Sequence, residues 1–391
     1  MKLKRLPEDF RVEELPNVSP GESGRYRFYR LTKRGIGTLE ALDAIRRRWN
    51  LAAGQVSYGG LKDRHALTVQ YLTIADGAQR PLREQSFQLE PLGRITHPYG
   101  PSSFRGNRFE LTLRDFAPEA AKRAESAAAN VPIEGLPNYF DDQRFGSVGF
   151  DGGFIAEAWL KGDHEQALRL AIAEPNPSDR PETRAEKAIL RETWGDWPAA
   201  KARLDRSHAR SLVTYLVDHP TDFRGAFARL RRELRSLYFS AYQSFLWNLW
   251  LGRLIETTTR PDQRVPIDFK VATLPLFRDL DADQVARLRD ASLPLPSTRN
   301  SPPADQSGSI IESLLAERGL TWGDLRVKHL KDVFFSKGTR PALFFPSGLT
   351  ARTEPDDLYP GRRKILLSFE LPKGAYATLL VKRVTEGAAP A

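Results

Sequence analysis

The sequence of residues 56–74 is VSYGGLKDRHALTVQYLTI. Apolar and polar side chains alternate at both ends of this stretch, which predicts a short strand over 56–58 and a longer strand over 67–74. Two adjacent glycines end the first strand and favour a connection in which the backbone can approach a ligand closely. We therefore expect Lys62 and Asp63 to lie in a connection between two strands.

The segments on either side of this stretch also show strand and helix patterns. Alternating apolar residues predict strands, and apolar residues three or four positions apart predict helices. In the first part of the chain we expect strands over 10–15, 25–31 and 109–113 and helices over 38–49 and 118–130. From about residue 154 to residue 336 the pattern is largely helical, and strand signals return over 343–345, 365–371 and 376–384.

This order of strands, helices and strands predicts an α+β fold in which one domain is interrupted by another. The first and last strands would then complete a single mixed or antiparallel sheet. The glycine-rich stretch 146–153 marks the change in composition. We therefore expect a discontinuous catalytic domain over 1–153 and 337–391 and a largely helical α/β insertion over 154–336.

Charge and composition narrow the classes of function. The 391 residues include 59 Lys+Arg against 49 Asp+Glu, a net charge of +10, and 44 of the cations are arginines. The guanidinium group of arginine binds phosphates through two hydrogen bonds and stacks on bases. This balance favours a nucleic-acid partner, although it also fits a basic protein without one.

Several kinds of chemistry have no support in the sequence. The chain has no cysteine, so it has no disulfide, thiolate nucleophile, iron–sulfur cluster or cysteine-based zinc site. Its six histidines show no metal-binding spacing, and no glycine-rich nucleotide-binding loop is present. We therefore expect neither a metal nor a nucleotide cofactor. The sequence shows no membrane-spanning stretch and no signal-peptide pattern, so a cytoplasmic protein is expected.

Asp63 is the first candidate catalytic residue. It follows two glycines and is flanked by Lys62, Arg64 and His65. A carboxylate among cations stays ionised, so Asp63 could act as a nucleophile or as a general base. The same composition also fits a charged turn that faces water.

Residues 138–146, NYFDDQRFG, form the second candidate segment. Aromatic rings that stack on unpaired bases and amides that read base edges are typical of RNA-binding sites. Asp141 and Asp142 could instead form a metal site or an acid–base pair. A turn that follows a strand and carries a core phenylalanine is the third interpretation.

Clusters of basic residues in the predicted insertion are candidate phosphate contacts. They comprise Lys201, Arg203, Arg206, Arg210, Arg224, Arg229, Arg231, Arg232 and Arg235. A solvent-exposed helix face carries similar charges, so both interpretations stay open. The aromatic and leucine residues of 242–250 recur at helical spacing, which predicts a buried helix face.

Five segments, in the same order along the chain, resemble the signature motifs of the TruD family of tRNA pseudouridine synthases. Residues 60–70, GLKDRHALTVQ, resemble the most specific of these motifs. Residues 4–13 are similar to the family's N-terminal strand. Residues 105–109, 137–146 and 368–378 resemble its KGNxF, PNYFxxQRFG and FxLPxGSYAT motifs, respectively.

The resemblance implies a pseudouridine-synthase core interrupted by a family-specific insertion. It implies an isomerase that converts uridine to pseudouridine in tRNA, at position 13 in the D arm, without a cofactor. Asp63 would be the catalytic aspartate and Lys4 the basic residue beside it. The residues that match positions lining the uridine pocket are Phe10, Asn138, Phe140 and Phe369. We expect a monomer that binds tRNA and does not bind a membrane.

Two other classes of function stay open from the residues alone. A non-catalytic RNA-binding protein could keep the same fold, and it would bind RNA without forming product. A nuclease that uses Asp141 and Asp142 would cleave the strand in a reaction that EDTA stops. The mechanism is also open, because Asp63 could attack C1′ of the ribose or remove the 2′ proton to form a glycal.

Overall fold

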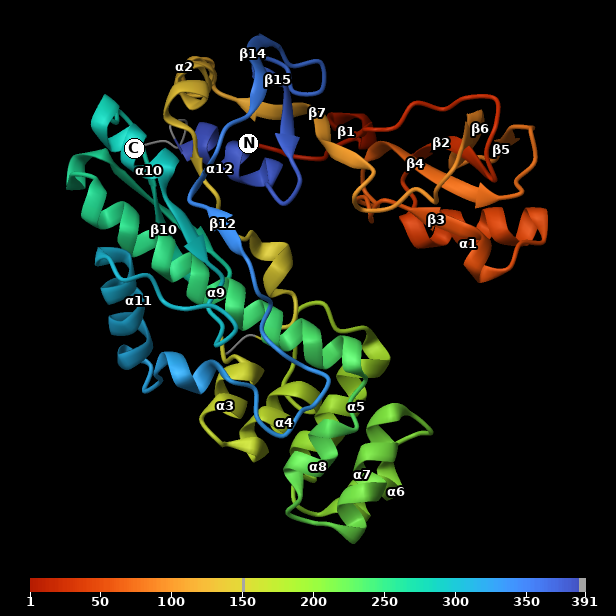
Figure 1. Cartoon of the computed structure of the whole chain (residues 1–391), viewed down its shortest axis with the longest axis vertical. Coiled ribbons are helices and arrows are strands. Elements are labelled where there is room, and N and C mark those ends of the chain that lie inside the picture. The colour runs from red at the N-terminus through yellow and green to blue at the C-terminus, as the bar shows by residue number, and fades with distance from the viewer. Residues whose placement is uncertain (150–151, 387–391) are drawn as a thin grey trace. The chain divides into compact units, whose positions relative to one another are not determined.

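The computed structural model of the chain describes residues 1–149 and 152–386 (Figure 1). The chain forms two compact units. The first unit contains residues 1–136 and the chain from residue 344 onward, and the second contains residues 137–343. The chain therefore leaves the first unit and returns to it, as the order of the predicted strands and helices indicates.

The first unit is built on one sheet, in which nine strands lie within the described residues. They are β1 (Phe10–Pro16), β2 (Tyr26–Arg34), β3 (Val56–Tyr58), β4 (Leu67–Ala75), β5 (Leu82–Arg83), β6 (Phe87–Ile95), β7 (Phe104–Phe116), β14 (Ser347–Pro355) and β15 (Arg363–Pro372). Their order is β14-β15-β7-β1-β4-β2-β6-β5, and β3 also pairs with β4. β1 and β4 are parallel, whereas the other described pairs of this sheet are antiparallel. The predicted α+β fold with a mixed sheet is confirmed.

The C-terminal strands complete the sheet that the first strands begin. β15 pairs with β7 and places Phe369 opposite Phe109. The two backbones come close at Gly106, because a Cβ atom there would lie 2.2 Å from the carbonyl oxygen of Leu371. Only glycine fits at this position without moving one of the strands. This close approach explains the glycine in the 105–109 motif.

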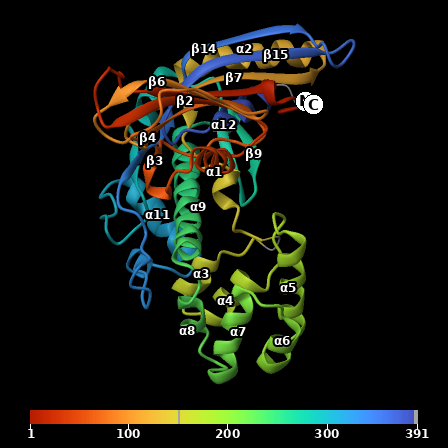
Figure 2. The same cartoon turned by 90° about the vertical axis from the view of Figure 1, so that its right-hand side faces the viewer.

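Helices α1 (Thr38–Trp49), α2 (Pro118–Glu134) and α12 (Ala377–Glu386) belong to the first unit. α1 buries its apolar face in a core that it shares with β2 and β4, and α2 packs along β14 and β15 (Figure 2). The prediction of a strand over 376–384 is wrong, because this segment forms α12. Its buried side chains lie three or four residues apart, as on a helix face. They include Ala377, Leu380, Val381 and Val384.

The second unit is largely helical, as predicted for the insertion. Its helices are α3 (Ile155–Leu160), α4 (His164–Ile172), α5 (Pro181–Glu192), α6 (Trp197–Arg203), α7 (His208–Asp218), α8 (Phe223–Ala228), α9 (Arg232–Thr258), α10 (Ala282–Asp290) and α11 (Gln306–Glu317). Two antiparallel strand pairs accompany them. These are β9 (Arg264–Phe269) with β10 (Ala272–Phe277), and β11 (Ser292–Pro294) with β12 (Thr339–Pro341).

The core of the second unit lies along α9, which packs against α3, α10, α11 and β10 (Figure 1). The aromatic face predicted over 242–250 is buried there, including Trp247 and Trp250. The indole Nε1 of Trp250 donates a hydrogen bond of 2.7 Å to the carbonyl oxygen of Ser307 in α11. Neither α9 nor any other helix within residues 1–149 and 152–386 is both long enough and apolar enough to span a bilayer.

The two units divide at different residues from the predicted domains. The chain passes between them at β8 (Leu136–Pro137) and at β13 (Leu343–Phe344), whereas the predicted boundaries follow residues 153 and 336. Residues after Pro137 belong to the second unit because the ring of Tyr139 packs edge-on against Phe269, and that of Phe140 against Trp247. The assignment of a catalytic domain and an insertion domain stays a prediction.

Candidate active site

Asp63 lies in the loop between β3 and β4, where the sequence places it. Its carboxylate forms an ion pair with Lys4, whose Nζ lies 2.7 Å from Oδ2 of Asp63. The side chains of Lys4 and Asp63 are 26% and 32% exposed, so the pair is partly desolvated but still accessible. A charged hydrogen bond of this length holds the carboxylate in one orientation.

Phe10 lies beside the same ion pair. The centroid of its ring is 3.9 Å from Nζ of Lys4, a distance at which the ring face attracts a cation. The backbone of Lys4 is left-handed, with φ of 57°, a conformation that residues other than glycine rarely adopt. Neighbouring contacts must therefore hold Lys4 in place.

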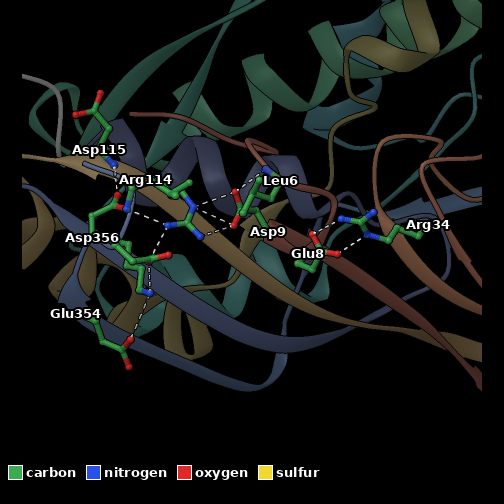
Figure 3. Close-up of polar contacts among 11 residues, drawn as sticks. Leu6, Glu8, Asp9, Arg34, Arg114, Asp115, Glu354 and Asp356 are labelled. Atoms are coloured by element: carbon green, nitrogen blue, oxygen red, sulfur yellow. Dashed lines mark hydrogen bonds and ion pairs between the residues drawn. The ribbon is translucent and has the colours of Figure 1, made fainter. Parts of the chain in front are cut away.

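Buried ion pairs anchor the segment 2–10, which carries both of these residues (Figure 3). Lys2 forms an antiparallel bridge with Arg114 of β7. The guanidinium of Arg114 donates to Asp9 from Nε at 3.0 Å and to Asp356 from Nη1 at 3.0 Å. These charged hydrogen bonds, above all that to Asp9, raise the pKa of Arg114. Lys4 thus lies between two points at which the segment is attached to β7.

Lys33 of β2 holds the backbone of the Asp63 loop. It is 1% exposed. Its Nζ donates to the carbonyl oxygens of Ile36 and Asp63, both at 2.8 Å, and also lies 3.4 Å from that of Lys62. Burial lowers the pKa of Lys33 to about 8, an effect that the negative charge of Asp63 opposes. A buried cation thus ties the loop to the sheet through main-chain oxygens.

Polar residues of the 60–70 motif hold the beginning of the loop. Oγ1 of Thr38, in α1, accepts the N–H of Lys62 at 2.9 Å and donates to Oε1 of Gln70 at 2.8 Å. Nε2 of Gln70 donates to the carbonyl oxygen of Gly60 at 3.3 Å. The loop is therefore bound from α1, β2 and β4, and its geometry is specified before any substrate binds.

The side chain of Lys62 forms a buried ion pair with Glu14 of β1. Its Nζ lies 2.6 Å from Oε1 of Glu14, and both side chains are buried. Glu14 also accepts the N–H of Tyr71 and the hydroxyl of Tyr99, both at 3.2 Å. Burial and the nearby charge of Glu14 raise the pKa of Tyr99. A buried pair with this many additional hydrogen bonds can offset its own desolvation.

Phe10 and Phe369 belong to one row of aromatic rings that crosses three strands. The ring of Phe109 lies between them, edge-on to Phe10 at 6.3 Å and stacked on Phe369 at 5.3 Å between centroids. All three side chains are buried. The return of β15 to the sheet is what places Phe369 in this row.

In the second unit, Asn138 and Phe140 form a cluster with Arg340. Nε of Arg340 donates to the carbonyl oxygen of Asn138 at 2.7 Å, and Nη2 donates to Oδ1 at 2.6 Å. The guanidinium carbon lies 4.2 Å from the centroid of the Phe140 ring. The amide of Asn248, in α9, binds the N–H and the carbonyl oxygen of Phe140, both at 2.8 Å. The backbone of this segment is therefore tied to α9.

The structure thus places the predicted site residues in two groups, each within one unit. Lys4, Phe10, Asp63 and Phe369 lie in the first unit, and Asn138 and Phe140 lie in the second.

Asp141 and Asp142 were the candidates for a metal-dependent site. Oδ1 of Asp142 accepts the N–H of Lys270 at 2.8 Å, and Asp141 is buried. Across residues 1–149 and 152–386, no three or more histidine, aspartate or glutamate side chains are grouped so that they could hold a metal ion. The described part of the chain therefore offers no three-ligand centre at these residues.

Arg235, one of the candidate phosphate contacts, fits neither interpretation of the cluster, because it is neither exposed nor unpaired. Its side chain is buried, with Nη1 and Nη2 at 2.7 and 2.8 Å from the carboxylate oxygens of Asp332. Arg229 covers the ring of Tyr215, with 3.4 Å between the guanidinium carbon and the ring centroid. Arg231 and Arg232 are exposed. Arginines that look alike in the sequence therefore differ in the structure, because some are buried or paired and others are exposed.

Three residues that support the site, Glu14, Lys33 and Arg340, are not among those that the sequence motifs predict. Glu14 is in phase with Phe10, and Lys33 is in phase with Leu31, on the buried faces of their strands. A charged residue at an inward position of a strand is a signal that could have been noticed. No comparable local signal marks Arg340, because its contacts with Asn138 join residues about 200 positions apart.

The chain is similar to known proteins over nearly its whole length. A sequence model of the family described as tRNA pseudouridine synthase D (TruD) matches residues 1–384. A protein of Methanocaldococcus jannaschii named "Probable tRNA pseudouridine synthase D 2" is 32% identical, and the match covers 99% of this chain and 92% of that protein. A protein of Methanococcus maripaludis named "Probable tRNA pseudouridine synthase D 1" is 30% identical, with 98% and 99% covered.

A solved structure is similar as well. The crystal structure of a Methanosarcina mazei protein described as "Putative tRNA pseudouridine synthase D (TruD)" matches with a TM-score of 0.77 and 27% identity. The match covers 98% of this chain and 93% of that chain. Both the sequence and the fold are therefore similar over nearly the whole length.

Proposed function

The chain belongs to the tRNA pseudouridine synthase D family and is thus a tRNA pseudouridine synthase, an isomerase, in which we propose that Asp63 is the catalytic carboxylate. We also propose that its target is the uridine at position 13, in the D arm of tRNA. The target is supported by the resemblance of the motifs.

Pseudouridine formation conserves the atoms of uridine. The C1′–N1 bond breaks and a bond forms between C1′ and C5, while C5 loses a proton and N1 gains one. The reaction needs a carboxylate held near the ribose, a surface that retains the detached base, and removal of the nucleotide from its stack. Each of these tasks can be assigned to residues of the chain.

The ion pair between Lys4 and Asp63 is the observation that carries the proposal. It lies in the loop that contains the family's most specific motif, and Asp63 stays accessible to a ribose. Its carboxylate could attack C1′ to form a glycosyl ester or could remove the 2′ proton. Lys4 would keep the carboxylate aimed, and Lys33 would keep the loop from moving as the base turns.

The base would be held by aromatic rings and an amide. Phe10 and Phe369, in the first unit, would form an apolar surface for the base. The resemblance of the motifs implies further roles for two residues of the second unit, Phe140 as a stacking ring and Asn138 as a hydrogen-bonding amide. Stacking on an aromatic ring contributes about 1–3 kcal/mol per base. Extrusion of a base costs a few kcal/mol, so stacking can offset most of this cost.

The test is to map pseudouridine on unmodified tRNA transcripts incubated with the purified protein. Carbodiimide adducts stop primer extension at modified positions, so the site can be read directly. Asp63→Asn removes the proposed catalytic charge. Asp76→Asn is a matched control, because Asp76 is exposed and has φ of 54°, which asparagine adopts readily. We expect a stop at position 13 with the wild type and the control but not with Asp63→Asn, which still binds tRNA.

Other outcomes have distinct meanings. Appreciable turnover by Asp63→Asn would contradict the role of this residue. Modification of a different uridine would contradict the target but not the chemistry. Binding without product would favour the non-catalytic RNA-binding protein. Strand cleavage in Mg²⁺ that EDTA stops would favour the nuclease.

A further inference from the structure

A cationic cavity of about 200 Å³ lies in the second unit, far along the chain from the Asp63 loop. One wall is the turn after α3, and the other is the segment that follows the short helix η5 (Trp322–Leu325). Its basic lining residues are Lys161, His164, Arg326, Lys328 and His329. A water molecule takes up about 30 Å³ in the liquid, so the cavity can hold one phosphate group and several waters.

The basic residues of this cavity outnumber its acidic ones. The hydrogen bond from Thr321 and the charge of Lys328 lower the pKa of Asp324, so this carboxylate balances part of the positive charge. Across the described part of the chain, neither Arg326 nor Lys328 has an ion pair within 4 Å. Asp324 is the only acidic residue in the lining, and its carboxylate already accepts the N–H and the hydroxyl of Thr321 at 2.9 and 2.7 Å. Lys161 already forms an ion pair, in which its Nζ lies 3.0 Å from Oε1 of Glu157. The cavity therefore has a positive charge that an anion can balance.

The floor of the cavity carries a polar atom that can bind a hydrogen-bonding group. Nε1 of Trp159 donates to the carbonyl oxygen of Lys328 at 3.1 Å, which joins the two walls. The rings of Trp159 and His164 are 4.4 Å apart between centroids. Nδ1 of His164 is buried and has no hydrogen-bond partner among the described residues. Burial and the nearby charge of Arg224 lower the pKa of His164, so its ring carries one N–H donor and one acceptor at neutral pH.

We propose that this cavity binds a backbone phosphate of the tRNA, apart from the nucleotide that is modified. Arginine and lysine with free donors are the side chains that bind phosphate oxygens, and such contacts position a nucleic acid without reading its sequence. This proposal rests on the proposed function, because it takes tRNA as the ligand. In this proposal the phosphate is bound by Arg326 and Lys328. Neither residue belongs to the basic clusters that the sequence offers as candidate phosphate contacts.

The experiment measures tRNA affinity as a function of salt. The double variant Arg326→Gln/Lys328→Gln removes both cations from exposed positions. Arg278→Gln/Arg287→Gln is the matched control, because it removes two exposed arginines elsewhere in the same unit. Fluorescence anisotropy of labelled tRNA over a KCl series then gives Kd and the slope of log Kd against log salt for each protein.

We expect the cavity variant to raise Kd about tenfold at ~0.1 M KCl and to reduce the salt slope by about one, since one phosphate contact is lost. The control should change Kd by less than about twofold. Equal losses of affinity in both variants would overturn the proposal, because the overall positive charge of the protein would then explain the losses. No loss in the cavity variant would overturn it as well.

A second measurement uses inorganic phosphate as the probe. NMR signals of the histidine side chains are followed as phosphate is added to the full chain, with His329→Gln used to assign that residue. We expect the signals of His164 and His329 to shift in the wild type and not in the cavity variant. Shifts that persist in the cavity variant would contradict a site built on Arg326 and Lys328.

The two proposals can fail separately. Affinity is measured with the Asp63→Asn chain, so no turnover is needed. If the cavity variant binds normally while Asp63 is required for pseudouridine formation, only the phosphate site is wrong. If the cavity variant loses affinity while Asp63→Asn stays active, only the assignment of the catalytic carboxylate is wrong.

Discussion

Nζ of Lys4 lies 2.7 Å from Oδ2 of Asp63, although the two residues are 59 positions apart in the chain. The contact exists because the segment before β1 is attached to β7 through Arg114, while the loop after β3 is attached to β2 through Lys33. The catalytic carboxylate that we propose is thus held from two directions, one through its charge and the other through its backbone.

Replacing Lys4 by methionine should slow the reaction without weakening tRNA binding. A hydrogen bond to a charged group contributes about 1.5–3 kcal/mol, which corresponds to about a 10- to 100-fold loss in kcat if it is needed in the transition state. Single-turnover kinetics measures this loss, and Lys4→Arg should restore part of it. Lys2→Met, in the same segment, serves as the control. A normal kcat for Lys4→Met would contradict the role given to the ion pair.

Replacing Glu14 by glutamine should destabilise the first unit. The change leaves Lys62 as a buried charge without its partner, which costs about 3–5 kcal/mol of unfolding free energy. Urea denaturation measures the change. The control is Glu110→Gln, which breaks an exposed ion pair with Arg11 and should cost less than about 1 kcal/mol. Similar losses in both variants would show that burial of the Glu14 pair has no special effect.

Lys33 should make the stability of the protein depend on pH. Its pKa is about 8 in the folded chain and 10.5 when unperturbed, so the unfolded state binds more protons between these values. The unfolding free energy should therefore rise with pH in this window, by at most about 1.4 kcal/mol per pH unit from this residue. Stability is correspondingly lost as the pH falls from 10.5 to about 8, below which this residue adds no further change.

The measurement for Lys33 is urea denaturation of the wild type and Lys33→Met from pH 8 to pH 10. Buried tyrosines such as Tyr29, whose pKa is about 12 in the folded chain and 10.0 when unperturbed, also affect stability near pH 10. Because both proteins share these tyrosines, the difference between the two slopes isolates the contribution of Lys33. The slope should be steeper in the wild type than in Lys33→Met. Parallel slopes would show that Lys33 does not titrate in this window.

Replacing Arg340 by lysine should affect catalysis more than folding. A lysine cannot reproduce the two hydrogen bonds from Nε and Nη2 to Asn138 while also covering the ring of Phe140. We expect kcat/KM to fall about 10- to 100-fold, equivalent to about 1.4–2.7 kcal/mol. Thermal unfolding should change little, as in the control Arg299→Lys. An unchanged kcat/KM would contradict the roles proposed for Asn138 and Phe140.

Much of the fold can be predicted from local patterns. Alternating apolar residues indicate β1, β2 and β4, and helical spacing indicates α1 and the buried face of α9. The error at α12 has a local cause, because Thr378, Val381 and Val384 are β-branched and favour strands by propensity. Packing of their apolar face against α2 outweighs this weak preference.

The chain's own motifs and periodicity were enough to predict the interrupted α+β order, the loop that carries Asp63 and the family, because these depend on residues close together in sequence. The partners of the charged side chains could not be predicted in this way. Lys62 meets Glu14 across 48 positions, and Arg235 meets Asp332 across 97. Strand order, register and helix packing bring such residues together, and no local pattern records which of them will be buried.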